Sequence, residues 1–170
     1  MVILVMGLPG SGKSFFASRL AQVLHADYFN SDRIRMDRLD KRTYSDEEKQ
    51  RVYDDLLLGM EQSIQQHKNV VLDATFYKNS IREKFMEKAN KTDVLACIEV
   101  IAAEDLIRKR LSHSREFSEA RFDTYQKILR EWEPLTEKHL ILESTNQNVH
   151  IMLQKAIHYL HWIKYEKRGS

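Results

Sequence analysis

The 170-residue sequence contains little cysteine, proline or glycine, with one, two and five residues respectively. The single cysteine, Cys97, excludes an internal disulfide, and its place in the apolar run VLACIEVIA predicts a buried, reduced packing residue. The scarcity of proline and glycine favours regular helices joined by short loops. Because these absences argue against a disulfide-stabilised secreted domain, we expect a cytoplasmic protein.

Long apolar runs and a strong net charge are also lacking. No window approaches the roughly 20 apolar residues that a membrane-spanning helix needs, and the apolar start MVILVM has no basic leader before Gly7 interrupts it. We therefore expect no signal peptide and no membrane partner. The net charge of +2 at pH 7 is too weak to indicate nucleic-acid binding by itself. Basic residues do cluster at 33–42 and 107–110, and the simplest interpretation of these clusters is solvated helix faces and loops.

The composition is that of a globular protein, with 42% hydrophobic and 31% charged residues. Apolar runs and segments of helical periodicity alternate about five times along the chain. Strands are expected at 2–6, 26–29, 69–73, 93–102 and 139–143. Helices are expected from 13, at 46–68, 80–89, 104–111 and 121–132, and from about 149 onward. The alternation predicts a single domain over residues 1–170 with a three-layer α/β/α fold, in which helices cover both faces of a five-stranded parallel sheet.

Two of the expected helices start with a capping-box pattern. Ser45 is followed three residues later by Glu48, and Ser80 by Glu83. In this motif the serine oxygen accepts a hydrogen bond from the backbone amide three residues on, and the acidic side chain reaches back to the serine amide. The pattern predicts helix starts at about Asp46 and directly after Ser80.

The stretch GLPGSGKS at 7–14 lies between the first expected strand and the first expected helix. It fits the phosphate-binding pattern G-x-x-x-x-G-K-[ST], with Gly7, Gly12, Lys13 and Ser14 at the fixed positions. Glycines let backbone N–H groups turn toward a triphosphate, and the helix N-terminus adds its positive dipole end. Lys13 can span the β- and γ-phosphates, and Ser14 can ligate Mg²⁺. The expected nucleotide contacts are Gly10, Ser11, Gly12, Lys13, Ser14 and Phe15. The motif therefore predicts ATP or GTP with Mg²⁺ as the cofactors.

Asp73 ends the apolar run VVLD, which is expected to form a strand. Ligands of open α/β sheets bind outside the carboxyl ends of the strands, so an acid at this position can hold Mg²⁺ or its waters. The alternative is an aspartate that only forms the turn before the next helix. We favour the role beside the metal.

Asp32 and Arg35 follow the second expected strand, at the same edge of the sheet. If a helix begins there, their spacing of three places both side chains on one face. A carboxylate can then accept the proton of an attacking hydroxyl, and an arginine beside it can bind a phosphate of the acceptor. The alternative is an N-capping aspartate with a local ion pair.

Four motifs together resemble the P-loop polynucleotide kinase family, which includes the kinase modules of phage and bacterial nucleic-acid end-healing enzymes. They are GLPGSGKS, NSDRIR, VVLDAT and IRKRLSHSR, and they extend the resemblance over residues 1–132. The resemblance implies a P-loop kinase sheet with the first strand at its centre, and a helical lid at about 108–120. It implies phosphoryl transfer to the 5′-hydroxyl end of DNA or RNA, and a phosphatase or ligase module fused to or associated with the kinase.

The resemblance also implies roles for individual residues. Asp32 matches the general base that activates the 5′-hydroxyl, and Arg35 matches the arginine that binds the neighbouring phosphate. Arg110 and Arg115 match the two lid arginines that stabilise the charge of the transferred phosphoryl group. The family spaces these arginines four residues apart, whereas here they are five apart, so Arg108 is an alternative to Arg110.

Two other functions remain open at this stage. The same scaffold serves small-molecule kinases that act on a nucleoside, sugar or antibiotic hydroxyl. A nucleotide-hydrolysing switch or binding module would use no acceptor except water, and the Asp32–Arg35 pair argues against it. The seven histidines lack a familiar metal-ligand spacing and are interpreted as surface residues.

Overall fold

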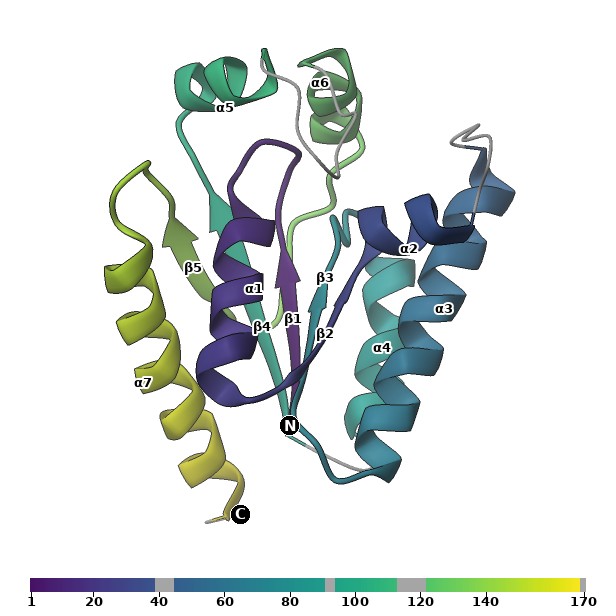
Figure 1. Ribbon diagram of the computed structural model, residues 1–170, viewed down its shortest axis with the longest axis vertical. Coiled ribbons are helices and arrows are strands. Elements are labelled where there is room, and N and C mark those ends of the chain that lie inside the picture. Colours follow the sequence, from purple (N-terminus) through teal and green to yellow (C-terminus); the bar gives the residue numbers. More distant parts are fainter. Residues whose placement is uncertain (39–44, 91–93, 113–121, 169–170) are drawn as a thin grey trace.

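The structure is a computed structural model that describes residues 1–38, 45–90, 94–112 and 122–168. Five parallel strands form one sheet in the order β2-β3-β1-β4-β5, so the first strand is central (Figure 1). The strands are β1 (Val2–Met6), β2 (Asp27–Asn30), β3 (Val70–Asp73), β4 (Leu95–Ile101) and β5 (Leu140–Glu143). The predicted five-stranded parallel sheet is confirmed.

Helices cover both faces of this sheet, as the sequence predicts. The helices are α1 (Lys13–Leu24), α2 (Ser31–Arg38), α3 (Asp46–Gln65), α4 (Asn79–Asn90), α5 (Glu104–Leu111), α6 (Phe122–Arg130) and α7 (Val149–Arg168). Figure 1 shows α1 and α7 on one face and α3 and α4 on the other. Helices α5 and α6 lie beyond the upper ends of the strands, next to the loop between β1 and α1.

The central strand shows why the fold has three layers. All five residues of β1 are fully buried, which requires cover on both sides. Ile3 and Val5 belong to the hydrophobic cluster with α1 and α7, whereas Leu4 and Met6 belong to the cluster with α3 and α4. Side chains alternate between the faces of a strand, so this short run supplies both cores. Cys97 is buried in the second cluster, as predicted.

The predicted start of α4 at a Ser80 cap is wrong. The helix begins at Asn79, and the Lys78 carbonyl accepts the first hydrogen bonds, from the amides of Ile81 and Arg82. The amide of Asn79 donates instead to the Glu133 carboxylate at 2.6 Å. A residue 54 positions away thus satisfies the helix N-terminus, and no local motif could predict that.

The capping prediction for α3 is confirmed for the serine, because Ser45 Oγ accepts a hydrogen bond from the Glu48 amide at 3.2 Å.

Within the described ranges, no helix is both long enough and apolar enough to cross a membrane.

Candidate functional site

The loops that carry the predicted site residues leave the sheet at one edge. The strands are parallel, so the carboxyl ends of β1, β2 and β3 lie together. In the pairing register Val5 lies opposite Asp73, and Asp73 lies opposite Asn30. The sheet therefore places the phosphate-binding loop, Asp73 and the start of α2 side by side.

The backbone of the phosphate-binding loop depends on glycine, as Gly7 and Gly12 show. Gly7 has φ +148°, and a Cβ there would lie 2.3 Å from the Val100 carbonyl oxygen. Gly12 has φ +91°, and a Cβ there would lie 2.8 Å from Ser144 Oγ. Gly12 is also the N-cap of α1 and supplies no side chain to its first amides, which suits a helix end that receives an anion.

A cavity of about 480 Å³ opens beside this loop. Lys13, Ser14 and Phe15 line one side of it, and residues 144–146, which follow β5, line the other. The cavity is also lined by Gly10, Gly12, Phe16, Arg110, Val149 and Met152. Polar groups at the loop and apolar groups toward α7 match the two ends of a nucleoside triphosphate.

The side chains beside Ser14 fit a magnesium ion. The Asp73 side chain is completely buried, and its Oδ2 atom accepts hydrogen bonds from Tyr28 Oη at 2.7 Å and Asn30 Nδ2 at 2.5 Å. Within the described residues its Oδ1 atom has no hydrogen-bond partner. Asn30 Nδ2 also lies 3.4 Å from Ser14 Oγ. A buried carboxylate oxygen without a donor, close to the serine of the phosphate-binding loop, is the kind of ligand that Mg²⁺ or its waters prefer.

Burial, together with the charge of Asp73, raises the pKa of the Tyr28 hydroxyl well above its ordinary value. The hydroxyl therefore remains protonated and acts as a donor to Asp73.

Helix α2 forms directly after β2, and Asn30 caps it instead of Asp32. Asn30 Oδ1 accepts from the Arg33 amide at 2.9 Å, which excludes Asp32 as the N-cap. The ion pair of the alternative interpretation is present, since Arg35 Nη1 lies 3.0 Å from Asp32 Oδ1. The Asp32 side chain is 32% exposed, so it remains accessible from solvent.

Arg35 has a second carboxylate partner, which the sequence did not reveal. Its Nε atom lies 3.0 Å from Glu48 Oε1, and the Glu48 side chain is only 6% exposed. Glu48 belongs to the first turn of α3, where the capping-box pattern predicts that its side chain reaches back to Ser45. The structure therefore ties α2 to α3 through Arg35.

The arginines of α5 differ in their positions. Arg110 Nη1 donates to the carbonyls of Gly10 and Ser11 and to Ser144 Oγ, at 3.2, 3.1 and 2.8 Å. Arg108 instead pairs with Glu104 on the helix surface and stacks on the Phe122 ring. Arg110 is thus the α5 arginine that lines the cavity beside the phosphate-binding loop.

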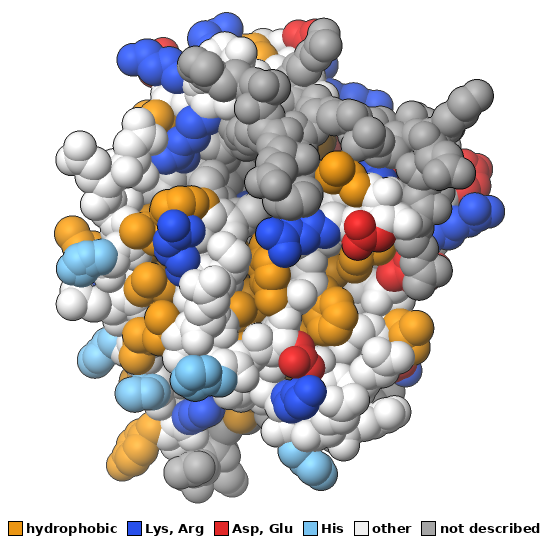
Figure 2. All heavy atoms as spheres, in the orientation of Figure 1, with side chains coloured by type: hydrophobic (Ala, Val, Ile, Leu, Met, Phe, Trp, Pro, Cys, Tyr) orange, Lys and Arg blue, Asp and Glu red, His pale blue; other side chains and the backbone are white. Residues whose placement is uncertain are grey.

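Two further predictions concern the second lid arginine and the histidines. Arg115 lies outside the described residues, as does most of the predicted lid. Figure 2 shows histidines along the α7 side of the visible face. In the described part of the chain, no group of three His, Cys, Asp or Glu side chains is arranged to hold a metal ion.

Besides Glu48, sequence reasoning missed Tyr28, Asn30 and Ser144 as contributors to this site. Tyr28 and Asn30 alternate along β2 and therefore share a face, which is a signal that the sequence does carry. Asn30 and Ser144 each lie at the carboxyl end of a strand, as Asp73 does. These positions identify candidates, whereas the contacts between them depend on the sheet register.

A comparison with protein families matches residues 2–135 to the model described as an AAA domain (AAA_33). The chain belongs to this AAA domain family of P-loop proteins. A search of curated proteins gave no match for this AAA-domain chain.

Solved structures show the same fold. A sugar kinase from Janibacter sp. HTCC2649 has a TM-score of 0.72 at 17% identity, covering 94% of each chain. A gluconokinase from Sinorhizobium meliloti 1021 has a TM-score of 0.65 at 19% identity, covering 95% of each chain. Chaetomium thermophilum Kti12 in complex with ADP-AlF3 has a TM-score of 0.69 at 16% identity, covering 92% of this chain and 97% of that one. At such identities the AAA-domain chain shares the P-loop kinase fold with these proteins.

Proposed function

We propose that this protein is a Mg²⁺-dependent kinase that transfers the γ-phosphate of ATP or GTP to a hydroxyl group, with Asp32 as the general base. One observation carries the proposal. The Asn30 side chain contacts Ser14 and Asp73 on the nucleotide side, and Asp32 follows two residues later at the start of α2. A partly exposed carboxylate thus follows two residues after a side chain that contacts the phosphate-binding helix, and an acceptor hydroxyl can approach it from solvent.

Each of these residues has a defined part in the reaction. The loop amides and Lys13 bind the β- and γ-phosphates, and Arg110 holds the loop carbonyls and adds positive charge to the pocket wall. Ser14 and Asp73 are the residues that would hold Mg²⁺, which neutralises charge on the phosphates when bound. Asp32 orients the acceptor hydroxyl and takes its proton as the oxygen attacks.

The surroundings of Arg35 favour a small polar acceptor, such as a sugar or a related polyol, as the substrate. Its guanidinium lies between two carboxylates, those of Asp32 and Glu48. Both carboxylates lie 3.0 Å from the guanidinium and already engage it. An acceptor phosphate would have to compete with these carboxylates for the guanidinium, whereas a neutral hydroxyl compound would not. One structurally similar protein is named as a sugar kinase, which is consistent with this substrate class.

The second candidate acceptor is the 5′-hydroxyl end of DNA or RNA. It is supported by the motif NSDRIR, which places Arg33 and Arg35 on α2. Arg33 is exposed on α2 and could contact a nucleic-acid phosphate. If the acceptor is a nucleic-acid 5′-hydroxyl, replacing Arg35 by alanine weakens transfer to an oligonucleotide more than transfer to a nucleoside.

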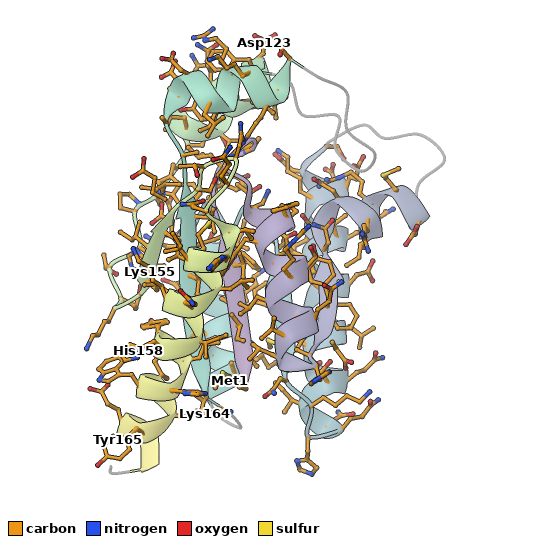
Figure 3. All side chains as sticks on the ribbon, turned by 60° about the vertical axis from the view of Figure 1, so that its left-hand side comes forward. Met1, Asp123, Lys155, His158, Lys164 and Tyr165 are labelled. Atoms are coloured by element: carbon orange, nitrogen blue, oxygen red, sulfur yellow. The ribbon has the colours of Figure 1, made fainter. Side chains whose placement is uncertain are left out.

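An acceptor screen tests the proposal. The wild-type protein is incubated with γ-labelled ATP or GTP and, separately, with sugars, polyols, nucleosides and 5′-OH oligonucleotides. Asp32→Asn serves as the inactive variant. His158→Ala serves as the matched control, because His158 lies on α7, well below the end of the molecule that Asp123 marks (Figure 3). Transfer to a sugar or polyol supports the first acceptor class, and transfer only to oligonucleotides supports the second. Release of labelled phosphate without transfer to any acceptor contradicts the kinase assignment.

A further inference from the structure

The Asn30 side chain joins three parts of the site. Its Nδ2 atom lies 2.5 Å from Asp73 Oδ2 and 3.4 Å from Ser14 Oγ, and its Oδ1 atom accepts from the Arg33 amide at 2.9 Å. The residue is 6% exposed. One buried carboxamide therefore contacts the phosphate-binding helix, the carboxylate at the end of β3 and the first turn of α2.

The orientation of this carboxamide follows from its partners. An ionised carboxylate accepts hydrogen bonds and cannot donate them, whereas a backbone N–H group donates and cannot accept. The NH₂ group must therefore face Asp73, and the oxygen must face Arg33. The reverse orientation would bring two acceptors together at Asp73 and two donors together at Arg33.

Tyr28 adds a second donor to the same carboxylate oxygen. Its hydroxyl lies 2.7 Å from Asp73 Oδ2. The two oxygens of Asp73 are thus unequal, because Oδ2 receives two protein donors while the buried Oδ1 receives none within the described residues. A carboxylate held by one oxygen has its other oxygen fixed in direction.

We propose that Tyr28 and Asn30 are positioning residues that fix the Asp73 carboxylate with Oδ1 toward the cation, and that Asn30 also couples this carboxylate to the start of the acceptor helix α2. The inference rests on the proposed function, since it assumes that Mg²⁺ and a nucleotide bind at this edge. It assigns a role to two residues that belong neither to the phosphate-binding motif nor to the Asp32–Arg35 pair.

Three variants separate the two parts of the proposal. Tyr28→Phe removes the hydroxyl donor and keeps the ring, over which the Arg33 guanidinium lies at 5.7 Å. Asn30→Ser removes the donor to Asp73 but keeps a side-chain oxygen that can cap α2. Asn30→Ala removes both the donor and the cap. None of the three variants changes the sequence of the phosphate-binding loop or replaces Asp73.

The first measurement is the Mg²⁺ concentration that half-saturates binding of β,γ-imido-ATP or β,γ-imido-GTP, followed by calorimetry. We expect it to rise about tenfold in each of the three variants, with near wild-type nucleotide affinity once Mg²⁺ is in excess. A merely structural role would lower nucleotide affinity at every Mg²⁺ concentration. An unchanged Mg²⁺ requirement in both Tyr28→Phe and Asn30→Ser would overturn the positioning role.

The second measurement is hydrogen exchange of the backbone amides at 31–37. We expect exchange to be about fivefold faster in Asn30→Ala, because α2 loses its cap, and near wild type in Asn30→Ser and Tyr28→Phe. Equal exchange in Asn30→Ala and wild type would overturn the coupling to α2. Thermal melting of each variant shows whether the whole domain has weakened.

Neither measurement requires phosphoryl transfer, so the two proposals can fail separately. A wild-type protein that binds Mg²⁺ and nucleotide but phosphorylates no hydroxyl contradicts the proposed function and leaves the positioning role standing. If the wild-type protein is a kinase, and all three variants need the same Mg²⁺ concentration as the wild type, only the positioning role is contradicted.

Discussion

The Nε atom of Arg35 lies 3.0 Å from Oε1 of Glu48, a carboxylate that is only 6% exposed. Because Arg35 also contacts Asp32, the three side chains form a carboxylate–arginine–carboxylate arrangement. Breaking a buried ion pair by removing one partner is costly, since the other charge stays buried without compensation. This arrangement holds α2 against α3 and sets the position of Arg35 beside Asp32.

We predict that Glu48→Ala lowers the free energy of unfolding by about 3 kcal/mol, and Glu48→Gln by roughly half as much. The glutamine keeps the shape and an oxygen that can accept from Arg35. Urea unfolding of both variants measures the effect. Glu87→Ala is the control, because Glu87 is exposed on α4 and should change stability by less than about 0.5 kcal/mol. Equal stabilities of Glu48→Ala and Glu87→Ala would contradict a structural role for the pair.

Arg110 and Arg108 should differ sharply when each is replaced by alanine. Arg110→Ala leaves the carbonyls of Gly10 and Ser11 without their guanidinium donor, so we expect at least tenfold weaker nucleotide binding by calorimetry. Arg110→Lys should not restore binding, because a lysine lacks the forked donor geometry. Arg108→Ala removes an exposed ion pair and should change affinity less than twofold. The reverse order would place Arg108 at the nucleotide instead.

The Cys97 thiol should be unreactive in the folded protein. Burial, with a smaller contribution from the charge of Glu137, raises its pKa from the ordinary 9.0 to about 12. The thiolate is the reactive form, so at pH 8.5 modification by a disulfide reagent should be slow and should accelerate only when urea unfolds the chain. Rapid modification without denaturant would contradict the burial of this thiol.

The same raised pKa of Cys97 has a consequence for stability. The unfolded chain loses the thiol proton near pH 9, whereas the folded chain retains it to about pH 12. The contribution of this group to stability is therefore constant below pH 9 and decreases as the pH rises above it. Cys97→Ala should show a smaller loss of stability between pH 9 and pH 10.5 in urea titrations.

The fold was largely predictable because its elements depend on local pattern. The run VILVM is apolar at every position, and this requires a strand buried on both faces, as β1 is. The start of α4 was missed for the opposite reason. Its first amide bonds to Glu133, and that contact exists only once the chain has folded. Local rules fail where a distant segment satisfies a helix end.

The site divides in the same way. The phosphate-binding loop, Asp32, Arg35 and Asp73 stand at positions fixed by short motifs or strand ends, and the structure brings them to one edge of the sheet. Asn30 was overlooked because an asparagine before a helix is an ordinary cap, and only the register with Asp73 shows its second contact. Glu48 was assigned to a cap because its partner on α2 is 13 residues away and outside any local motif.

The most direct test of the central claim compares Asp32→Asn with the wild-type protein in two parallel assays. One assay measures transfer of label from γ-labelled nucleotide to the best acceptor of the screen, and the other measures affinity for the β,γ-imido nucleotide with Mg²⁺. Loss of a general base costs about 10²–10⁴-fold in rate, so we predict at least a 100-fold loss of transfer with nucleotide affinity within about twofold of wild type. Phosphorylation at a near wild-type rate in Asp32→Asn would contradict the assignment of this carboxylate as the base and, with it, the proposed mechanism.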